Sequence, residues 1–403
     1  MTDPLGQSQV LPYICELSKK GYRFHLISFE KPDKFIQLKS SIQKICDDHS
    51  IVWHPQPYTK TPPILSTIGD IRVMYRKAFE LHKSENFSIV HCRSYLPGMI
   101  GRLLKKKNPK LKFIFDMRGF WIDERVEGNI WNLKNPIYRT IFNYFKIKEK
   151  QLFREADAVI SLTEIAIPII KKIRGNSVRE LNYTVIPCCV DTNKFNFNLF
   201  SDEDIESKRH ELGIDKNDYV LIYLGSISTW YLPEEMLDFY KVLIQRKNNT
   251  KFLIITQEDP TWLIKLAETK NIPTDQLIIK SANRNEVPSL INVSNGTVFF
   301  IKQSFSKMAS SPTKKAELMS MGIPIVCNSK IGDTERIINE GKTGFVCTDF
   351  DQNNYEKAVK ALLSFPNTKE EKTRIRNQAI AQFSLLEGSN RYYEMYETIL
   401  HQE

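Results

Sequence analysis

The sequence lacks the features that mark a membrane-spanning or secreted protein. No apolar run reaches the roughly 18 residues of a spanning helix, and no basic segment followed by an apolar stretch opens the chain. The seven cysteines form no C-x-x-C pair and most lie in apolar runs, so we expect reduced core thiols in a cytoplasmic protein. No G-x-S-x-G string occurs and the seven histidines do not cluster at metal spacing, which argues against serine-hydrolase and zinc chemistry.

What the chain has is the composition of a globular protein, 41% hydrophobic and 26% charged. Its 403 residues are too many for one ordinary core and predict about two domains. Residues 1–185 carry 31 Lys/Arg against 18 Asp/Glu, a net +13, whereas residues 186–403 carry 26 against 29, a net −3. A single basic domain indicates a polyanionic partner, either an anionic membrane surface or a nucleic acid, or else a solvated surface that only keeps the protein soluble.

The densest basic piece is RLLKKKNPKLK (102–112), which favours the membrane, since cations beside an anionic leaflet each gain about 1 kcal/mol. We expect no nucleic acid partner, because the aromatic and basic strand pattern of a stacking platform is absent.

Short apolar, β-branched runs alternate with longer amphipathic stretches along the whole chain. Such alternation predicts parallel sheets covered by helices, and two series of runs predict an α/β protein of two doubly wound domains. The runs lie at 24–30, 51–54, 87–93, 112–118 and 158–163 in the first half, and at 219–226, 251–256, 277–281, 297–302, 323–329 and 343–347 in the second.

The first series ends in the Pro-containing segment VIPCCVDTNKF (185–195), where we place the crossover between domains. We predict an N-terminal domain over 1–186, a C-terminal domain over 187–380, and a last helix over 381–403 that packs back on the first domain. The chain opens at MTDPLGQSQ, a turn that normally follows a first strand. We therefore expect that Met1 is an internal methionine and that roughly ten upstream residues, with the central strand, are missing.

The segment richest in chemistry is FSKMASSPTKKAELMSMGIPIVCNSKIGDTERIINEGKTGFVC (305–347). A strand feeds a small-residue loop and then a helix, with Ser311 as its expected N-cap and Pro312 at its first position. The unpaired backbone N–H groups of such a helix start suit a phosphate. Glu317 lies about 9 Å further along the axis, which is the reach from a diphosphate to ribose hydroxyls. The residues assigned to this site are Lys302, Lys307, Ser310, Ser311, Thr313, Lys314 and Glu317, with Gly332 in the next loop.

The run SPTKKAELMSMGIPIVCN, followed by IGDTERII and GKTGFV, resembles the donor-binding core of the retaining glycosyltransferases of family 4, which have the two-domain GT-B fold. DPLGQSQVLPYICELSKKGY resembles the opening of members that build bacterial capsule, exopolysaccharide or O-antigen chains. VIPCCVDTNKF, RSYLP (93–97) and FDMRGFWIDERVE (115–127) are also similar to that subgroup. The resemblance thus covers essentially the whole chain, and it implies two Rossmann-like domains that face a cleft.

The resemblance implies roles in the second domain. Glu317 matches the second Glu of the family's Glu-x7-Glu element and would hold the donor ribose, whereas the first Glu falls on Ala309. The loop GSISTWYLPEE (225–235) lacks the Arg and Lys that commonly follow the domain's first strand, so Lys302 or Lys307 is expected to supply charge against the diphosphate. The positions assigned to the donor by their place in the fold are Gly225, Ser226 and, in the turn Leu5-Gly6-Gln7 of the first domain, Gly6.

Several charged residues follow strands in the first domain. We assign Asp116 and Arg118, with Lys307 of the second domain, to catalysis. The acceptor would meet a set of charges on the same rim, namely Arg93, Asp123, Glu124 and Arg125. The alternative is that these charges only pair with one another, since charges left buried without a partner are costly. His91 ends a neighbouring strand and is more simply structural.

Two D-x-D strings, at 202–204 and 349–351, are interpreted as helix starts, where acidic residues favour the dipole. We expect no metal and no cofactor. The predicted function is transfer of a sugar from a nucleotide diphosphate to a lipid-linked glycan acceptor, with retention, by a cytoplasmic enzyme held at the inner face of the cell membrane. A nucleotide-sugar epimerase of the same fold and a non-enzymatic polyanion-binding protein are the alternatives.

Overall fold

The computed structural model describes residues 1–62, 64–176 and 181–401. The chain divides into two compact units: unit 1 contains residues 1–189 and 385–403, and unit 2 contains residues 190–384. These divisions lie three and four residues beyond the predicted boundaries at 186 and 380. The last helix of the chain, α17 (Leu385–Leu400), belongs to unit 1.

Unit 2 is built on one six-stranded parallel sheet in the order β12-β11-β10-β7-β8-β9. Its central strands are almost wholly buried, because helices cover both faces, and this explains their continuous apolar sequence. The strands are β7 (Tyr219–Leu224), β8 (Thr250–Ile255), β9 (Leu277–Lys280), β10 (Gly296–Phe299), β11 (Ile325–Asn328) and β12 (Gly344–Cys347).

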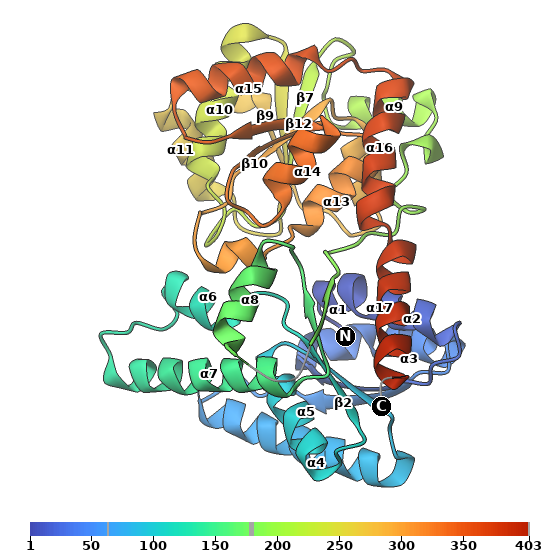
Figure 1. Cartoon of the computed structure of the whole chain (residues 1–403). Coiled ribbons are helices and arrows are strands. Elements are labelled where there is room, and N and C mark those ends of the chain that lie inside the picture. The colour runs from blue at the N-terminus through green and yellow to red at the C-terminus, as the bar shows by residue number, and fades with distance from the viewer. Residues whose placement is uncertain (63, 177–180, 402–403) are drawn as a thin grey trace. The chain divides into compact units, whose positions relative to one another are not determined.

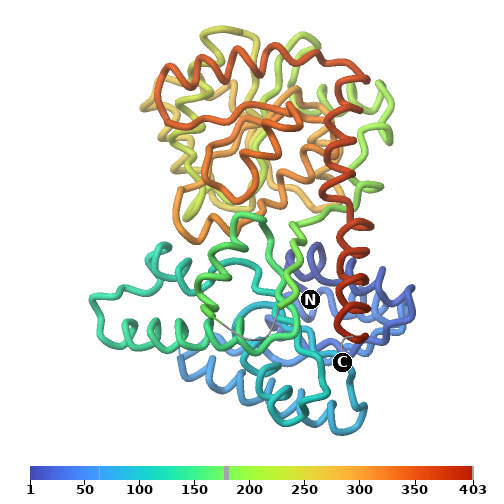
Figure 2. Tube along the Cα trace, in the orientation of Figure 1, coloured from blue at the N-terminus to red at the C-terminus, as the bar shows by residue number. Residues whose placement is uncertain are grey.

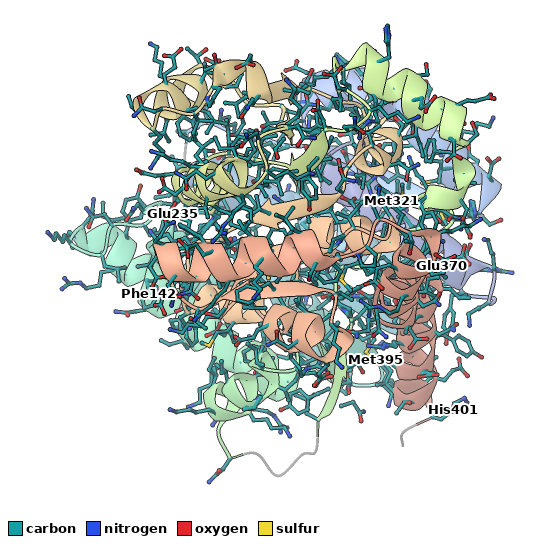
Figure 3. All side chains as sticks on the ribbon, turned by 90° about the horizontal axis from the view of Figure 1, so that it is seen from above. Phe142, Glu235, Met321, Glu370, Met395 and His401 are labelled. Atoms are coloured by element: carbon teal, nitrogen blue, oxygen red, sulfur yellow. The ribbon has the colours of Figure 1, made fainter. Side chains whose placement is uncertain are left out.

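Figure 1 shows α14 and α15 on opposite sides of β12, and both helices contact that strand. Side chains fill the layers between the helices and the sheet (Figure 3). The helices of unit 2 are α9 (Asp202–Glu211), α10 (Pro233–Arg246), α11 (Thr261–Thr269), α12 (Val287–Asn292), α13 (Thr313–Ser320), α14 (Thr334–Gly341), α15 (Gln352–Ser364) and α16 (Lys369–Phe383), with the short 3-10 turns η1 (Phe197–Leu199), η2 (Thr274–Gln276) and η3 (Ser306–Ala309).

Unit 1 has two separate parallel sheets, β1-β2 and β3-β4-β5-β6, where the sequence predicts one doubly wound sheet. The predicted upstream strand stays a prediction. The strands are β1 (His25–Glu30), β2 (Val52–Pro57), β3 (Ile89–Arg93), β4 (Lys112–Asp116), β5 (Ala158–Ser161) and β6 (Asn182–Val185). The helices are α1 (Pro4–Gln9), α2 (Leu11–Ser18), α3 (Pro32–Asp48), α4 (Leu65–Glu85), α5 (Tyr95–Lys107), α6 (Trp121–Glu127), α7 (Pro136–Glu155) and α8 (Ala166–Arg174), besides α17.

Helix α17 packs beside α2 although the two are at opposite ends of the chain (Figure 2). Tyr392 and Tyr396 of α17 are buried with Tyr13 of α2 and with Ile114 and Ile160 of the larger sheet. This packing explains the aromatic sequence of the last helix, which begins at Leu385, four residues later than the predicted start at 381.

Candidate active site

The loops after β7 and β10 of unit 2 start at neighbouring points of the same sheet edge. After β7 the chain moves toward β8, whereas after β10 it moves the other way, toward β11, so the strand order reverses between β7 and β10. Open parallel sheets bind ligands at such a reversal, beyond the carboxyl ends of the strands. The backbones join here, because Lys302 N donates to Trp230 O at 2.8 Å and Leu232 N donates to Phe300 O at 3.0 Å.

Lys314, at the start of α13, extends into this crevice and is 7% exposed. Its Nζ donates to the Tyr223 hydroxyl at 3.0 Å and lies 3.7 Å from the ring centre of Tyr231. Burial lowers the pKa of Lys314 well below its usual range, against the opposing effect of Glu317. Among the residues that the structure describes, no carboxylate forms an ion pair with this ammonium. An incoming anion would pair with this buried amine and favour its protonated, positively charged form.

Lys307, in η3, brings a second cation to the same loops. Its Nζ lies 3.7 Å from the ring centre of Trp230, which is a cation–π contact, and its carbonyl accepts a hydrogen bond from Gly332 N at 2.9 Å. The loop after β7 has no cation of its own, and Lys307 and Lys314 supply positive charge to it from η3 and α13. Lys302, in contrast, is exposed.

Glu317 lies one turn beyond Lys314 on α13 and is 7% exposed. Its Oε1 forms an ion pair with Arg284 at 3.1 Å. Burial raises the pKa of Glu317, while Arg284 and then Lys314 oppose that rise. The carboxylate is thus enclosed and paired in this structure, rather than standing open to solvent as a ribose-binding group.

The start of α13 differs in detail from the prediction. Pro312 is the N-cap, with extended backbone angles and no side-chain cap hydrogen bond of its own, and the helix begins at Thr313. Ser311 is therefore not the N-cap. The prediction took Pro312 as the first helical residue, but the helix begins one residue later. Ser310 N donates to Lys307 O at 3.2 Å, so the small-residue loop is folded back on η3.

Three further residues were predicted to bind the donor, and each already contacts another part of the protein. The Ser226 hydroxyl is hydrogen-bonded to Glu258, which also accepts from Ile227 N at 3.2 Å. Gly225 has a φ of 116° and lies against the Lys314 ammonium. Gly6 lies in α1, a short helix, where the sequence predicts a turn. A Cβ on Gly6 would lie 2.7 Å from Met1 Cα, so close backbone packing explains that glycine.

In unit 1, four residues from the edges of β3 and β4 and from α17 surround one carboxylate. Asp116 Oδ2 lies 3.5 Å from Arg93 Nη1 and 3.6 Å from His91 Nε2, and it accepts a hydrogen bond from the Tyr392 hydroxyl at 3.1 Å. Arg118 Nη1 lies 3.8 Å from Oδ1. Burial would raise the pKa of Asp116, but the cations around it, Arg118 foremost, lower it to about 2. Asp116 is therefore an anion at neutral pH.

The other charges assigned to the acceptor do not join this group. Asp123 accepts a hydrogen bond from Lys146 Nζ at 3.0 Å, and the same ammonium pairs with buried Glu149. Arg125 stacks on Trp121, 5.1 Å from the ring centre. Asp123 of α6 is thus paired with Lys146 of α7, which agrees with the alternative interpretation that these charges pair with one another. Glu124, beside Asp123 in α6, is half-buried.

Both D-x-D strings are helix starts, as predicted. Ser201 caps α9 and forms a capping box with Asp204, and Asp351 caps α15 by accepting from Asn354 N at 2.8 Å. Within the described ranges, no group of three or more His, Cys, Asp or Glu side chains has the spacing of a metal site. All seven cysteines are buried and form no disulfide within the described residues.

The basic segment 102–112 is largely paired within its own unit. Arg102 forms an ion pair with Glu155 at 2.7 Å, Lys105 pairs with Asp157 at 3.2 Å, and Lys107 lies 4.5 Å from the ring centre of Phe79. In the part of the chain that the structure describes, no helix is long and apolar enough to cross a membrane.

Sequence reasoning missed the partners of the key side chains. Lys314 lies against the rings of Tyr223 and Tyr231, and Glu317 pairs with Arg284, although these partners are distant in the sequence. In unit 1, Tyr392 of the last helix contacts Asp116. The Tyr-rich pattern of 385–400 was the one available signal.

Comparisons with known proteins agree with this architecture. A family model described as "Glycosyltransferase Family 4" matches residues 8–194, and one described as "Glycosyl transferases group 1" matches residues 204–382. The Staphylococcus aureus protein "Capsular polysaccharide biosynthesis glycosyltransferase CapM" is 21% identical over 311 residues, which cover 76% of this chain and 75% of that protein.

Solved structures show the same fold. A glycosyltransferase from Rickettsia africae has a TM-score of 0.71 at 17% identity, covering 99% of this chain and 97% of its own. Anabaena HepE, solved in complex with UDP and glucose, has a TM-score of 0.63 at 13% identity and covers 96% of both chains. The fold and these matches define a GT-B glycosyltransferase, an enzyme. The two family models together support a glycosyltransferase of family 4.

Proposed function

We propose that the enzyme transfers a sugar from a nucleotide diphosphate to a hydroxyl of a lipid-linked glycan acceptor, with retention at the anomeric carbon, in bacterial surface polysaccharide synthesis. The observation that carries the donor assignment is the buried ammonium of Lys314, which lies at the strand-order reversal of unit 2 without an ion-pair partner among the described residues. HepE was solved with UDP bound, which supports a nucleotide donor, and the likeness to CapM supports a polysaccharide role.

In the proposed reaction, the bond between the anomeric carbon and the diphosphate oxygen breaks, and a bond to the acceptor oxygen forms on the same face of the sugar. The acceptor proton passes to the departing diphosphate. Lys314 and Lys307 stabilise the negative charge that develops on that group, and their enclosure strengthens the effect because little water screens them. No metal ion takes part in this proposal. The backbone of Gly225, Ser310, Thr313 and Gly332 would line the diphosphate.

Glu317 would bind the ribose hydroxyls after it exchanges part of its contact with Arg284. That exchange does not leave the Arg284 charge buried without a partner. The Arg284 side chain is 39% exposed, so water solvates it when the carboxylate turns to a ligand. Arg284 then holds Glu317 ionised, which a hydrogen-bond acceptor for two hydroxyls requires.

We place the membrane contact of unit 1 on α7 rather than on the basic segment 102–112. Ile137, Tyr144 and Ile147 are 60%, 46% and 60% exposed, and their spacing of seven and three residues puts them on one side of the helix. Lys148 lies beside them, 5.0 Å from the ring centre of Tyr144. Figure 1 shows α7 as a long helix of unit 1. An exposed apolar stripe with adjacent cations fits the inner face of an anionic membrane, where an acceptor lipid would lie.

The donor assignment is tested by isothermal titration of the full chain with UDP, GDP, dTDP, the matching monophosphates and inorganic pyrophosphate. One nucleoside diphosphate is expected to bind at least about tenfold more tightly than its monophosphate, because the second phosphate meets Lys314 and Lys307. Glu317→Gln should weaken the ribonucleotide more than its 2′-deoxy form, whereas exposed Lys357→Met serves as the control. If every nucleotide binds no better than pyrophosphate, the donor assignment is wrong.

A further inference from the structure

The group of charges around Asp116 in unit 1 presents arginine and histidine side chains to solvent, and not its carboxylate. The side chain of Arg93 is 30% exposed, that of His91 is 24% exposed and that of Arg118 is 10% exposed, whereas Asp116 is 1% exposed. The single carboxylate thus lies beneath the surface, and a ligand at this edge of the sheet meets guanidinium and imidazole groups first.

The charge of this group is not balanced. Two guanidiniums face one carboxylate, and the other groups that act on both guanidiniums are the side chains of Tyr392 and of Cys188, to whose Sγ Arg118 Nη2 donates at 3.4 Å. Burial lowers the pKa of Arg93, and the neighbouring Arg118 lowers it further, because like charges so near one another repel. One positive charge therefore remains without an anion, and the Arg93 guanidinium that shares it is partly open to solvent, where a ligand can reach it.

Two polar atoms at the centre of the group also lack hydrogen bonds. Arg118 Nη1 and Asp116 Oδ1 are both buried, and neither has a partner within the described residues. They lie 3.8 Å apart, too far for a hydrogen bond with each other. An unsatisfied donor beside an unsatisfied acceptor indicates a ligand that carries both an anionic oxygen and a hydroxyl.

The backbone at this edge is strained at two neighbouring points. Arg118 has a φ of 55° and Ser94, which follows Arg93, has a φ of 73°, and neither is a glycine. Ser94 N donates to the carbonyl of Asp116 at 2.7 Å, so the two strained loops are joined. Strain of this kind is kept where it positions functional side chains.

We propose that Arg93 and Arg118 bind an anionic group, a carboxylate or a phosphate, carried by a sugar substrate, so that the enzyme acts on an acidic saccharide. Asp116 holds the two guanidiniums in place and accepts a hydrogen bond from a hydroxyl of the same sugar. This inference rests on the proposed glycosyl transfer, but it concerns unit 1 and not the nucleotide site.

The test is isothermal titration of the full chain with three probes of one ring shape: glucuronate, glucose 6-phosphate and glucose. The two anionic probes separate a carboxylate from a phosphate as the bound group, and glucose reports binding without either. At least one anionic probe is expected to bind tenfold or more above glucose. Arg93→Gln should remove most of that difference, whereas the exposed Arg23→Gln should leave it unchanged.

Arg118→Gln should have the same effect, and Arg118→Lys keeps the charge if the glutamine variant does not fold. Circular dichroism and UDP titration of each sample report on folding and on unit 2. If glucose binds as tightly as both anionic probes, or if a folded Arg93→Gln protein binds them unchanged while still binding UDP, the acidic-sugar subsite is wrong and the donor site stands. Failure of the wild-type chain to bind any of UDP, GDP and dTDP would instead contradict the proposed function.

Discussion

The ammonium of Lys314 occupies the space that a side chain on Gly225 would fill. A Cβ built on Gly225 would lie 2.9 Å from Lys314 Nζ, and the φ of 116° is one that only glycine adopts without strain. The glycine after β7 is therefore required both by backbone conformation and by the cation beside it.

Gly225→Ala is accordingly expected to lower the free energy of unfolding by about 1–3 kcal/mol and to displace the Lys314 ammonium. Urea unfolding measures the first effect, and nucleotide diphosphate titration measures the second. Gly213→Ala is a matched control, since Gly213 has a φ of 64° but no neighbour within 4 Å of its added Cβ. Equal loss of binding in both variants would contradict the role assigned to the contact.

Lys314→Met is expected to stabilise the ligand-free protein while weakening nucleotide diphosphate binding at least about tenfold. Burial depresses the pKa of Lys314, so between that lowered pKa and about 10.4 the unfolded chain binds more protons, and stability rises with pH. The variant should lose this rise. Urea titrations from pH 7 to pH 10 measure it, with Lys357→Met as the control; an unchanged pH profile would argue that Lys314 is not enclosed.

Asp116→Asn should destabilise unit 1 by about 3–5 kcal/mol at neutral pH, because it leaves two partly or fully buried guanidiniums without their counter-charge. The folded pKa of about 2 lies below the ordinary value, so the stabilisation is complete above about pH 4 and is lost as the pH falls toward 2. The difference from wild type should shrink over that range. Exposed Asp48→Asn should show no such trend in urea unfolding.

Treatment with EDTA is expected to leave the transfer rate within about twofold of its untreated value. The carboxylates of the D-x-D strings cap helices, and the proposed charge on the leaving diphosphate is met by lysines. A rate that collapses with EDTA and returns with Mg²⁺ would overturn this expectation.

Ile137→Ser together with Ile147→Ser should weaken binding to anionic vesicles by about tenfold or more, since each change removes an exposed apolar side chain that would enter the interface. Flotation with vesicles of phosphatidylglycerol and phosphatidylcholine measures this, and vesicles of phosphatidylcholine alone control for charge. Ile36→Ser, on α3, is the matched exposed control. Equal flotation of all variants would place the membrane contact elsewhere.

Much of the fold could be predicted because buried strands and helices appear in the sequence as local patterns of apolar residues. Every apolar run named from the sequence overlaps a strand, and the strand without such a run, β6, is four residues long and only half-buried. The helix 385–400 was recoverable because its aromatic positions repeat at helical spacing.

The site could be predicted only in part, because its contacts are distant in sequence. Glu317 and Lys314 were identified from a local pattern, but the pairing of Glu317 with Arg284 and the enclosure of Lys314 by Tyr223 depend on how strands are ordered in the sheet. For the same reason Asp123, which looked free to meet a substrate, proved to be paired with Lys146.

The division of unit 1 into two sheets has a consequence for how that unit opens. The smaller sheet has its own apolar cluster, which includes Leu11, Ile42 and Trp53, and Phe24 is among the side chains that pack against both this cluster and the next. Helix α2 also contributes buried residues to both clusters, but a segment with an apolar cluster of its own can open in a separate step. The amide protons of β1 should thus exchange with deuterium well before those of β4, and early breathing of this segment would leave the charged group around Asp116 intact.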